Sequence, residues 1–424
     1  MVENQTTMFQ LGGIVFTLFN VAVWFALRRR LVTAFPRRAR LLTFTSALLF
    51  VVALHPALFM AMGSWSAMRA LQPYLPDWLL MSAVGAQFAV IFYGLFLGAK
   101  GAPVFVANTV RRLRRLLSRQ ARGTAPERAL VDESRRRMMA RAALAVPLVA
   151  AMAGAGGVLA SRQLPVVRRL RLPVARELSA LHGVTIAQVS DLHIGSYMDA
   201  ERLDDIRDAV NALGADFHVI TGDLLDNHVN QLELASRFVR ELQPRRGETF
   251  LCMGNHEYIA ARSAHTETIV GGLEEAGGQM LLDEARPVRI GGHHLWLGAI
   301  DYPRGARGNT PASRPTRESL DIAVGQMRDD GAPRIVLSHH PRTFFEGREY
   351  PIDLMLSGHT HGGQIKAGRV GDWALTPILA VDFYHNGYYE HAGRRLYVNS
   401  GCGGWLPMRI NCPPEITLVE LVSV

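Results

Sequence analysis

The chain has 424 residues, a formal net charge of +9 and a sequence pI of about 9.9. Such a basic chain first suggests a nucleic-acid-binding protein, but its charge is unevenly distributed. Residues 1–179 carry 24 Lys and Arg against six Asp and Glu, whereas residues 180–424 carry 22 against 31. The C-terminal part is therefore acidic, which argues against a surface for duplex nucleic acid, and no nucleic-acid partner is expected.

The basic N-terminal part is also the apolar part. Four stretches with almost no charge each approach the length of about 20 residues that a helix needs to cross a bilayer. They are residues 9–27, 41–62, 78–97 and 142–160. A buried helix of a soluble protein is the alternative for each, above all for the fourth, which is rich in Ala and Gly and contains Pro147. Residues 1–160 are thus predicted to form a membrane region with about four transmembrane helices.

The arginines predict the orientation of this region. Residues 28–40 contain six arginines and residues 100–141 contain twelve basic residues, while the loop 63–77 contains only Arg69. The positive-inside rule then places both basic loops in the cytoplasm and both termini outside. We expect a multi-pass protein of the cell (inner) membrane with an extracytoplasmic C-terminal domain. Alternatively, the paired arginines before residues 142–160 resemble an internal export signal, and cleavage there would release the domain.

Residues 161–180 alternate apolar side chains with arginines and are predicted to be a basic linker. A first edge strand, or a basic strip lying on anionic lipid headgroups, are the alternatives. Lying on headgroups, this segment would hold the following domain, residues 181–424, close to the bilayer.

Five short apolar runs in residues 181–424 each end in residue types that bind metals. The runs are rich in β-branched residues and predict buried strands over residues 184–189, 217–220, 250–253, 335–337 and 352–356. A short motif comes just after each run. These motifs are DLH at 191–193, GDLLD at 222–226, GNHE at 254–257, SHH at 338–340 and GHTH at 358–361. Because the carboxyl ends of strands in an open α/β sheet border one crevice, these side chains are expected to meet at a single site.

The chemistry of the side chains narrows the kind of site. The seven candidate donors are Asp191, His193, Asp223, Asn255, His339, His359 and His361. Oxygen and imidazole donors without a thiolate suit Mn, Fe or Zn better than Ca or a structural Cys-rich zinc site. Seven donors are too many for one tetrahedral ion, so two divalent metal ions that share a bridging carboxylate are predicted.

The order of these five blocks resembles the calcineurin-like metallophosphoesterase superfamily, here in a membrane-anchored form. The resemblance implies a four-layer α-β-β-α sandwich and hydrolysis of phosphoester bonds by metal-activated water. It also implies two metal sites, the first formed by Asp191, His193 and His361 and the second by Asn255, His339 and His359. Asp223 would bridge the ions. His256 matches the family's histidine that contacts the phosphate and protonates the leaving group, which makes it the candidate catalytic residue.

Two neighbouring histidines compete for one ligand position. The resemblance favours His339 over His340, because the family's ligand follows the strand after one small residue and precedes a proline by two. Asp226 is expected to hydrogen-bond its loop and not to bind metal.

These features predict a membrane-anchored phosphoesterase acting on a phosphoester, with a lipid-linked or phospholipid-derived substrate considered because residues 161–180 would hold the site near the bilayer. Two alternatives remain at this point. One is a hydrolase of a nucleotide-linked lipid precursor at the cytoplasmic face. The other is a non-catalytic module that uses its metals to bind a phosphorylated ligand.

Overall fold

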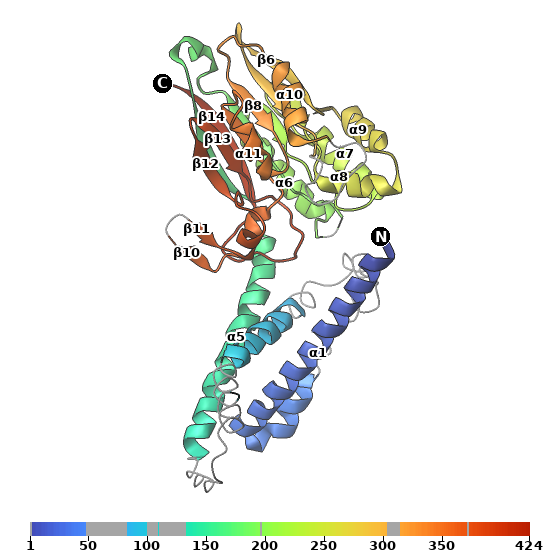
Figure 1. Cartoon of the computed structure of the whole chain (residues 1–424), viewed down its shortest axis with the longest axis vertical. Coiled ribbons are helices and arrows are strands. Elements are labelled where there is room, and N and C mark those ends of the chain that lie inside the picture. The colour runs from blue at the N-terminus through green and yellow to red at the C-terminus, as the bar shows by residue number, and fades with distance from the viewer. Residues whose placement is uncertain are drawn as a thin grey trace, which may run out of the picture. The chain divides into compact units, whose positions relative to one another are not determined.

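The computed structural model describes residues 2–47, 83–99, 109, 133–195, 197–302, 314–370 and 373–424. The chain separates into two compact units, Met1–Val158 and Leu159–Val424. Helices make up the described part of the first unit, and the strands of the described residues all belong to the second unit (Figure 1).

The first unit contains α1 (Val2–Ala34), a helix over residues 83–99 and most of α5 (Glu133–Ser161). The predicted stretches 9–27 and 142–160 lie in α1 and α5, whereas 41–62 and 78–97 fall partly outside the described residues. Among the described helices, one is long and apolar enough to cross a membrane by length and composition. It spans Arg137–Ser161 with a mean hydropathy of 2.0, and the apolar helix Ala83–Ala99 is shorter.

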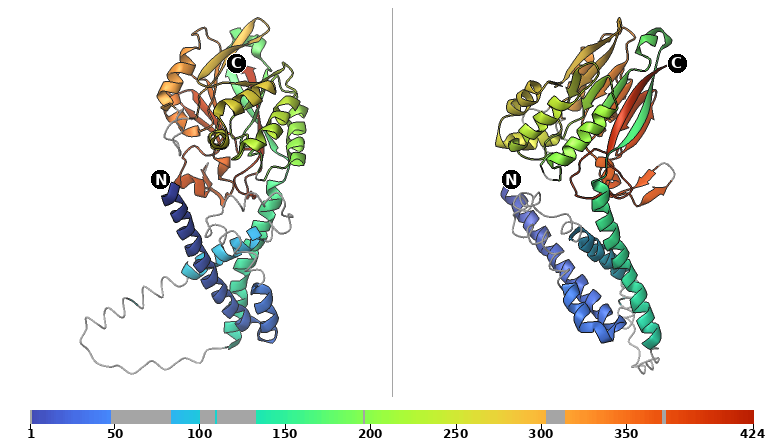
Figure 2. Two further views of the ribbon diagram at one scale, coloured as in Figure 1. Left: turned by 90° about the vertical axis from the view of Figure 1, so that its right-hand side faces the viewer. Right: turned by 180° about the vertical axis from the view of Figure 1, so that it is seen from behind.

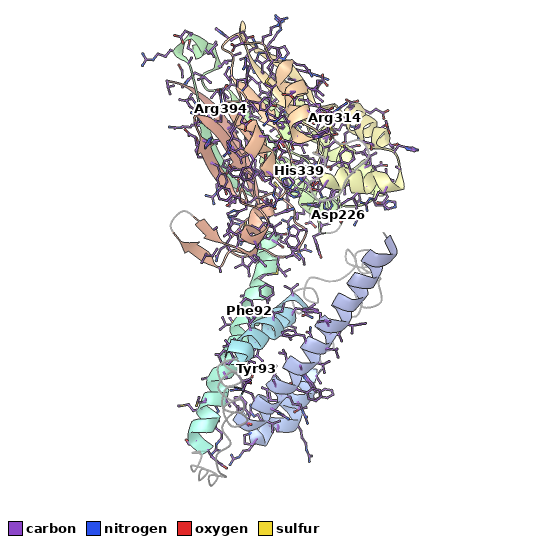
Figure 3. The ribbon with its side chains drawn as sticks, in the orientation of Figure 1. Phe92, Tyr93, Asp226, Arg314, His339 and Arg394 are labelled. Atoms are coloured by element: carbon purple, nitrogen blue, oxygen red, sulfur yellow. The ribbon has the colours of Figure 1, made fainter. Side chains whose placement is uncertain are left out.

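Side chains within this unit separate into an inner and an outer set. Tyr93 is fully buried against Val23 of α1 and Val90, whereas the neighbouring Phe92 is 47% exposed (Figure 3). The Arg141 guanidinium lies 5.3 Å from the centroid of the Phe35 ring and donates to the Ala34 carbonyl. Exposed apolar side chains on helices of this composition are what contact with lipid would require.

The second unit is built on two six-stranded sheets. The first has the order β1-β14-β2-β3-β4-β5. Its strands are β1 (Val166–Val174), β14 (Glu415–Ser423), β2 (Thr185–Val189), β3 (Phe217–Ile220), β4 (Glu248–Leu251) and β5 (Gly278–Met280). Strands β2 to β5 pair in parallel, so their carboxyl ends lie on one edge of the sheet.

The second sheet has the order β12-β13-β9-β8-β7-β6. Its strands are β12 (Gly387–His391), β13 (Arg394–Val398), β9 (Leu354–Ser357), β8 (Arg334–Leu337), β7 (His293–Ala299) and β6 (Glu284–Ile290). Strands β13, β9, β8 and β7 are parallel, with antiparallel strands at both edges. A separate hairpin is formed by β10 (Gly368–Val370) and β11 (Trp373–Leu375).

Alternating side chains of the strands build three cores. Ile186 and Val219 face the second sheet and pack with Leu354 and Leu356, whereas Ala187 and Ile220 face helices on the other side. Those helices are α6 (Ala200–Ala212), α7 (Leu232–Glu241), α8 (Asn255–Ala260) and α9 (Thr266–Glu275). The outer face of the second sheet packs on α10 (Thr316–Gly325) and α11 (Phe344–Gly347). The predicted four-layer α-β-β-α sandwich is confirmed (Figure 2).

The segment predicted as a basic linker contains an edge strand. β1 pairs in parallel with β14 over its whole length, from Val166 opposite Glu415 to Val174 opposite Ser423. Leu172 and Val174 are buried in the core between the sheets, while Arg168, Arg169 and Arg171 are exposed. The alternation of apolar and basic residues at 161–180 therefore reports a half-buried strand for residues 166–174.

Candidate metal centre

The candidate ligands lie in the turns that directly follow the strands. Five of them have positive φ angles, between 48° and 70°: Asp191, His193, Asp223, His359 and His361. Residues other than glycine rarely adopt this conformation, and those that do cluster at functional sites. Two glycines allow the turns to approach one another closely. A Cβ atom on Gly254 would lie 2.2 Å from Asp223 Oδ1, and one on Gly358 would lie 2.3 Å from Asp191 Oδ2.

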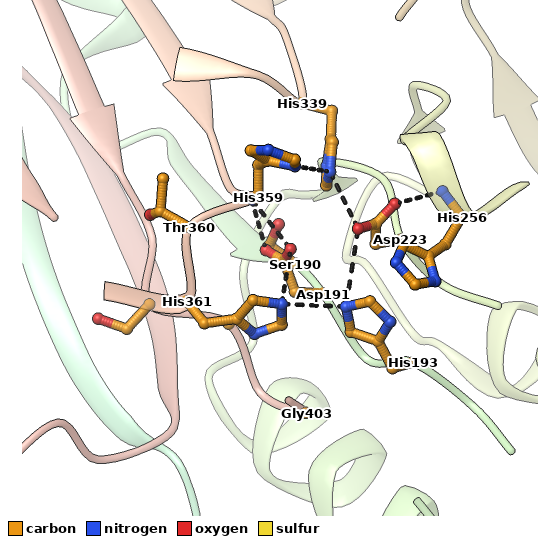
Figure 4. Close-up of polar contacts among 12 residues, drawn as sticks. Ser190, Asp191, His193, Asp223, His256, His339, His359, Thr360, His361 and Gly403 are labelled. Atoms are coloured by element: carbon orange, nitrogen blue, oxygen red, sulfur yellow. Dashed lines mark hydrogen bonds and ion pairs between the residues drawn. The ribbon is translucent and has the colours of Figure 1, made fainter. Parts of the chain in front are cut away.

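A first cluster joins the turns after β2 and β9. His193 Nε2 and His361 Nε2 are 3.0 Å apart, and His361 Nε2 lies 3.5 Å from Asp191 Oδ1 (Figure 4). All three side chains are at most 1% exposed. The Asp191 carboxylate also accepts hydrogen bonds from the His359 N–H, at 2.9 and 3.1 Å, which ties the two turns together.

A second cluster joins the turns after β4, β8 and β9. His359 Nδ1 lies 3.0 Å from Asn255 Oδ1 and 3.2 Å from His339 Nε2. His339 Nδ1 donates to the Thr221 carbonyl at 2.7 Å, so in the neutral ring Nε2 carries the lone pair that a metal ion would take. Burial opposes protonation, but Asp223 raises the pKa of His339 to about 9, so a metal ion would displace the proton on Nε2.

Asp223 lies between the clusters. Its Oδ2 is 3.6 Å from His193 Nε2 and 3.1 Å from His339 Nε2, while its Oδ1 accepts the His256 N–H at 2.9 Å. Burial would raise the pKa of Asp223, but His339 and His256 hold it well below the usual range. One ionised carboxylate oxygen therefore faces both clusters.

The donor atoms fit divalent metal ions. Each of the two close pairs of ring nitrogens, 3.0 and 3.2 Å apart, can share one proton or turn both lone pairs toward a common cation. Burial, reinforced by neighbouring histidines, lowers the pKa of His359 and of His361 well below the ordinary value. These rings are therefore neutral, as metal binding requires. Oxygen and nitrogen donors without a thiolate make up both sets.

Of the two adjacent histidines, His339 is the one that reaches Asp223. His340 instead accepts the Arg342 N–H on its Nδ1 at 3.2 Å, and its ring stacks on His359 with centroids 4.3 Å apart. His340 thus packs behind a candidate ligand, while His339 contributes to the second cluster.

His256 lies beside the clusters at the start of α8. Its Nδ1 contacts the Asp226 carbonyl and lies 3.3 Å from the Asp226 carboxylate, which is also 3.3 Å from His193 Nδ1. Burial opposes protonation, but Asp223 and Asp226 together raise the pKa of His256 to about 9. The ring of His256 is consequently cationic at neutral pH, and the Asp226 carboxylate contacts two histidines.

Two further features of the site were not assigned a role from the sequence. The buried Glu257 carboxylate accepts the backbone N–H groups of Asp223, Leu224, Leu225 and Gly254. Its position three residues after the N-cap Gly254 matches the Glu half of a capping box, in which the carboxylate accepts the N-cap N–H. The Tyr258 hydroxyl contacts both oxygens of Asp301 at 2.6 Å, next to Tyr302, whose ring lies against the histidines. No local motif links residues so far apart.

Comparisons with known proteins identify the family of the chain. The model of the calcineurin-like phosphoesterase family matches residues 184–363. A Danio rerio protein named transmembrane protein with metallophosphoesterase domain is 30% identical over 384 residues, which cover 86% of this chain and 79% of that protein. The phosphodiesterase YaeI of Escherichia coli is 32% identical, covering 55% of this chain and 80% of the relative. The UDP-2,3-diacylglucosamine pyrophosphatase LpxG of Chlamydia trachomatis is 27% identical, covering 60% and 88%.

The fold and the two donor clusters define a domain of the calcineurin-like phosphoesterase type. The chain belongs to the calcineurin-like phosphoesterase family. It spans 59% of the length of two related Helicobacter pylori metallophosphoesterases. Relatives named as transmembrane proteins, together with the apolar helix Arg137–Ser161, indicate membrane association.

Proposed function

We propose that this protein is a membrane-anchored phosphoesterase that works with two divalent metal ions. Asp191, His193 and His361 would hold the first ion, and Asn255, His339 and His359 the second. Asp223 would bridge them through Oδ2. One observation carries this proposal. Asp223 Oδ2 lies 3.6 Å from His193 Nε2 in the first cluster and 3.1 Å from His339 Nε2 in the second, while Asp223 Oδ1 accepts the His256 N–H. Mn, Fe and Zn suit these donors.

The side chains of the site divide the work of phosphoester hydrolysis. When bound, the metal ions supply positive charge that polarises a phosphoryl oxygen and acidifies a water molecule. His256 stands beside the bridging carboxylate with its side chain 16% exposed, so it can contact the phosphoryl group of a substrate and give its proton to the departing oxygen. Asp226 holds the imidazole in place through Nδ1, which directs Nε2 away from Asp226.

Hydrolysis of model substrates tests the reaction. The full chain, purified in detergent and loaded with Mn, should hydrolyse a model phosphodiester or phosphomonoester, and a chelator should abolish turnover. A metal-loaded chain that binds phosphate but hydrolyses no ester would overturn the proposal and favour a binding module.

The substrate that we propose is a lipid-linked or phospholipid-derived phosphoester at the extracytoplasmic face of the cell membrane. The proposal is supported by the apolar helix Arg137–Ser161, which ends immediately before the second unit's edge strand β1. It is also supported by the distribution of arginines in the N-terminal sequence. Hydrolysis of lipid phosphoesters by the full chain in mixed micelles, at a higher kcat/KM than for water-soluble esters, is the expected result.

A second candidate is hydrolysis of a nucleotide-linked lipid precursor at the cytoplasmic face. The similarity to a relative named UDP-2,3-diacylglucosamine pyrophosphatase favours it. The two candidates place the second unit on different sides of the membrane. Fusions of the C-terminus to alkaline phosphatase and, in a second experiment, to green fluorescent protein distinguish them. Activity of the phosphatase fusion places the domain outside, whereas fluorescence without phosphatase activity places it in the cytoplasm.

A further inference from the structure

A cavity of about 1100 Å³ lies beside the loop of His359 and His361, and none of the candidate metal ligands lines it. One wall is aromatic. Tyr384 is buried and packs edge to face on Phe383 and on Tyr389, with centroids 5.1 and 5.0 Å apart. Phe383 and Tyr388 are 49% and 45% exposed, so they offer ring faces on which a flat unsaturated group can stack.

The cavity also presents positive charge. Lys366 is the only lysine that follows residue 100 in the sequence. Its Nζ donates to Asn386 Oδ1 at 2.6 Å, and the other two N–H groups of this ammonium have no partner among the described residues. Arg168 and Arg348 line the same cavity. Two acids, Glu390 and Glu415, also line it, so the three cations leave one net positive charge that suits an anionic group.

The buried acid of the cavity is already engaged. Glu415 accepts hydrogen bonds from the Tyr397 hydroxyl at 2.7 Å and from Ser400 Oγ at 3.0 Å. No ion pair joins it to Lys366 among the described residues, and the two are linked through Asn386, which donates to Ser400 Oγ at 2.6 Å. The ammonium keeps its capacity for an external anion.

A histidine in the cavity wall has an unused acceptor. His385 is only 3% exposed, and its Nδ1 donates to the Phe383 carbonyl at 3.1 Å. Because a carbonyl only accepts, Nε2 carries the lone pair, and it has no partner among the residues that the structure describes. His385 lines the cavity, where Nε2 can accept a hydrogen bond from a hydroxyl or an amine of a ligand.

The cavity wall is bonded to the back of the metal loop. Thr360, between His359 and His361, is directed away from the two clusters, and its hydroxyl donates to the His385 carbonyl at 2.6 Å (Figure 4). A Cβ atom on Gly362 would lie 3.0 Å from Ser400 Oγ and 3.4 Å from Asn386 Cγ, so the loop packs tightly on residues of the cavity. The cavity thus lies on the side of the loop opposite the metal ligands.

We propose that this cavity is a second ligand site, separate from the metal centre, for a small anion that carries a flat unsaturated ring. This is the chemistry of a nucleoside monophosphate. The ring stacks on Phe383 and Tyr388, the anionic group binds Lys366 with the two arginines, and a hydroxyl or amine of the ligand donates to His385.

Calorimetric titration of the full chain in detergent with AMP, inorganic phosphate and dihexanoyl phosphatidic acid tests this site. AMP should bind saturably, and at least about tenfold more tightly than the other two, which corresponds to about 1.4 kcal/mol. Binding should persist in Asp223→Asn, in which the metal centre is disabled. Loss of AMP binding in Asp223→Asn, or tighter binding of the phosphatidic acid, would overturn the assignment.

Variants locate the site. Lys366→Ala should weaken AMP binding about tenfold or more, because one charge-assisted contact is lost. The matched control Arg328→Ala removes an exposed cation that does not line the cavity and should change nothing. Equal affinities of the two variants would contradict the proposal.

Chemical labelling tests the same contact without a mutation. An amine-reactive ester should acylate Lys366 more slowly when AMP is present, while acylation of Lys100 keeps its rate, as mass spectrometry of the peptides would show. An unchanged rate at Lys366 with saturating AMP would refute the site.

Discussion

At the residue scale, Asp223 gives its two carboxylate oxygens different tasks. Oδ1 is fixed by the His256 N–H, and Oδ2 faces His193 on one side and His339 on the other. The side chain is 1% exposed, yet the neighbouring histidines keep its pKa well below the usual range. The carboxylate of Asp223 thus stays ionised although it is buried, and Oδ2 faces only histidines. Such an arrangement suits the binding of cations.

Replacing His256 should separate catalysis from metal binding. His256→Ala should keep the metal ions, because this side chain lies outside both proposed ligand sets, and should lower kcat by about 10² to 10⁴, the usual contribution of a general acid. Turnover of a model ester and metal content measured on the same sample check this. A variant with kcat within about twofold of the parent protein would remove His256 from the mechanism.

The pH dependence follows from the same residue. Burial opposes protonation, but Asp223 and Asp226 raise the pKa of His256 to about 9, so its proton is present below this pH and lost above it. A bound divalent cation nearby lowers that value. The kcat profile should therefore fall at a pH of about 9 or somewhat lower, and this alkaline decline should be absent in His256→Ala. An identical decline in both proteins would assign it to another group.

The adjacent histidines provide a matched pair. His339→Ala should lose one metal ion and most activity, since His339 Nε2 lies in the second cluster. His340→Ala should retain both ions, because His340 lies in neither proposed ligand set. Its ring accepts the Arg342 N–H and stacks on the His359 ring. Metal analysis of both variants decides, and the opposite pattern would transfer the ligand role to His340.

At the scale of elements, the start of α8 holds the bridging turn. Glu257 accepts four backbone N–H groups, and an amide at this position offers only one acceptor oxygen. Glu257→Gln should therefore reduce the free energy of unfolding by about 1 to 3 kcal/mol and weaken metal binding. The control Glu267→Gln alters an exposed residue of α9 and should have little effect. Urea unfolding of the two variants, with and without metal, measures their stability and the stabilisation by metal. Equal stability of the two variants would contradict the role of Glu257.

Strand β3 contains a buried histidine that should make stability depend on pH. His218 is fully buried, neither ring nitrogen has a partner among the described residues, and burial lowers its pKa to about 4. The unfolded chain takes up this proton near pH 6.5. The neutral ring therefore makes its full contribution to the free energy of unfolding above about pH 6.5. This contribution declines as the pH falls toward 4, by at most about 3 kcal/mol.

The variant His218→Leu should lack the pH-dependent contribution of His218 to the free energy of unfolding. In metal-free protein, the free energy of unfolding of the parent chain should fall more steeply between pH 6.5 and 4 than that of His218→Leu. Denaturant unfolding at several pH values gives the difference between the two curves, and parallel curves would show that His218 does not titrate on unfolding.

Much of the site could be predicted because its ligands follow buried strands directly. Runs such as Phe217–Ile220 are buried on both faces, and the ligand residues come within four residues of the strand ends. Strand β1 was harder to predict, because its arginines also suit a linker and its partner β14 lies at the far end of the chain. The Tyr258–Asp301 contact depends on tertiary packing, which no local pattern encodes. A Glu at the start of α8 is a local signal for the bond to the Gly254 N–H, but not for the bonds to the turn after β3.

At the scale of the whole molecule, charge and hydropathy divide the chain close to the boundary between its two structural units. The basic and apolar sequence belongs mainly to the helical unit, and the acidic sequence to the sandwich that carries the metal centre. The high pI therefore comes from the arginines that flank the apolar stretches.

The most direct test of the central claim is the metal content of the purified full chain, measured by mass spectrometry of the elements together with ester hydrolysis. The parent protein and His256→Ala should each contain two metal ions per chain. Asp223→Ala should lose both ions and its activity, because the carboxylate oxygen between the clusters is gone. Full metal content in Asp223→Ala would contradict a bridged two-metal centre.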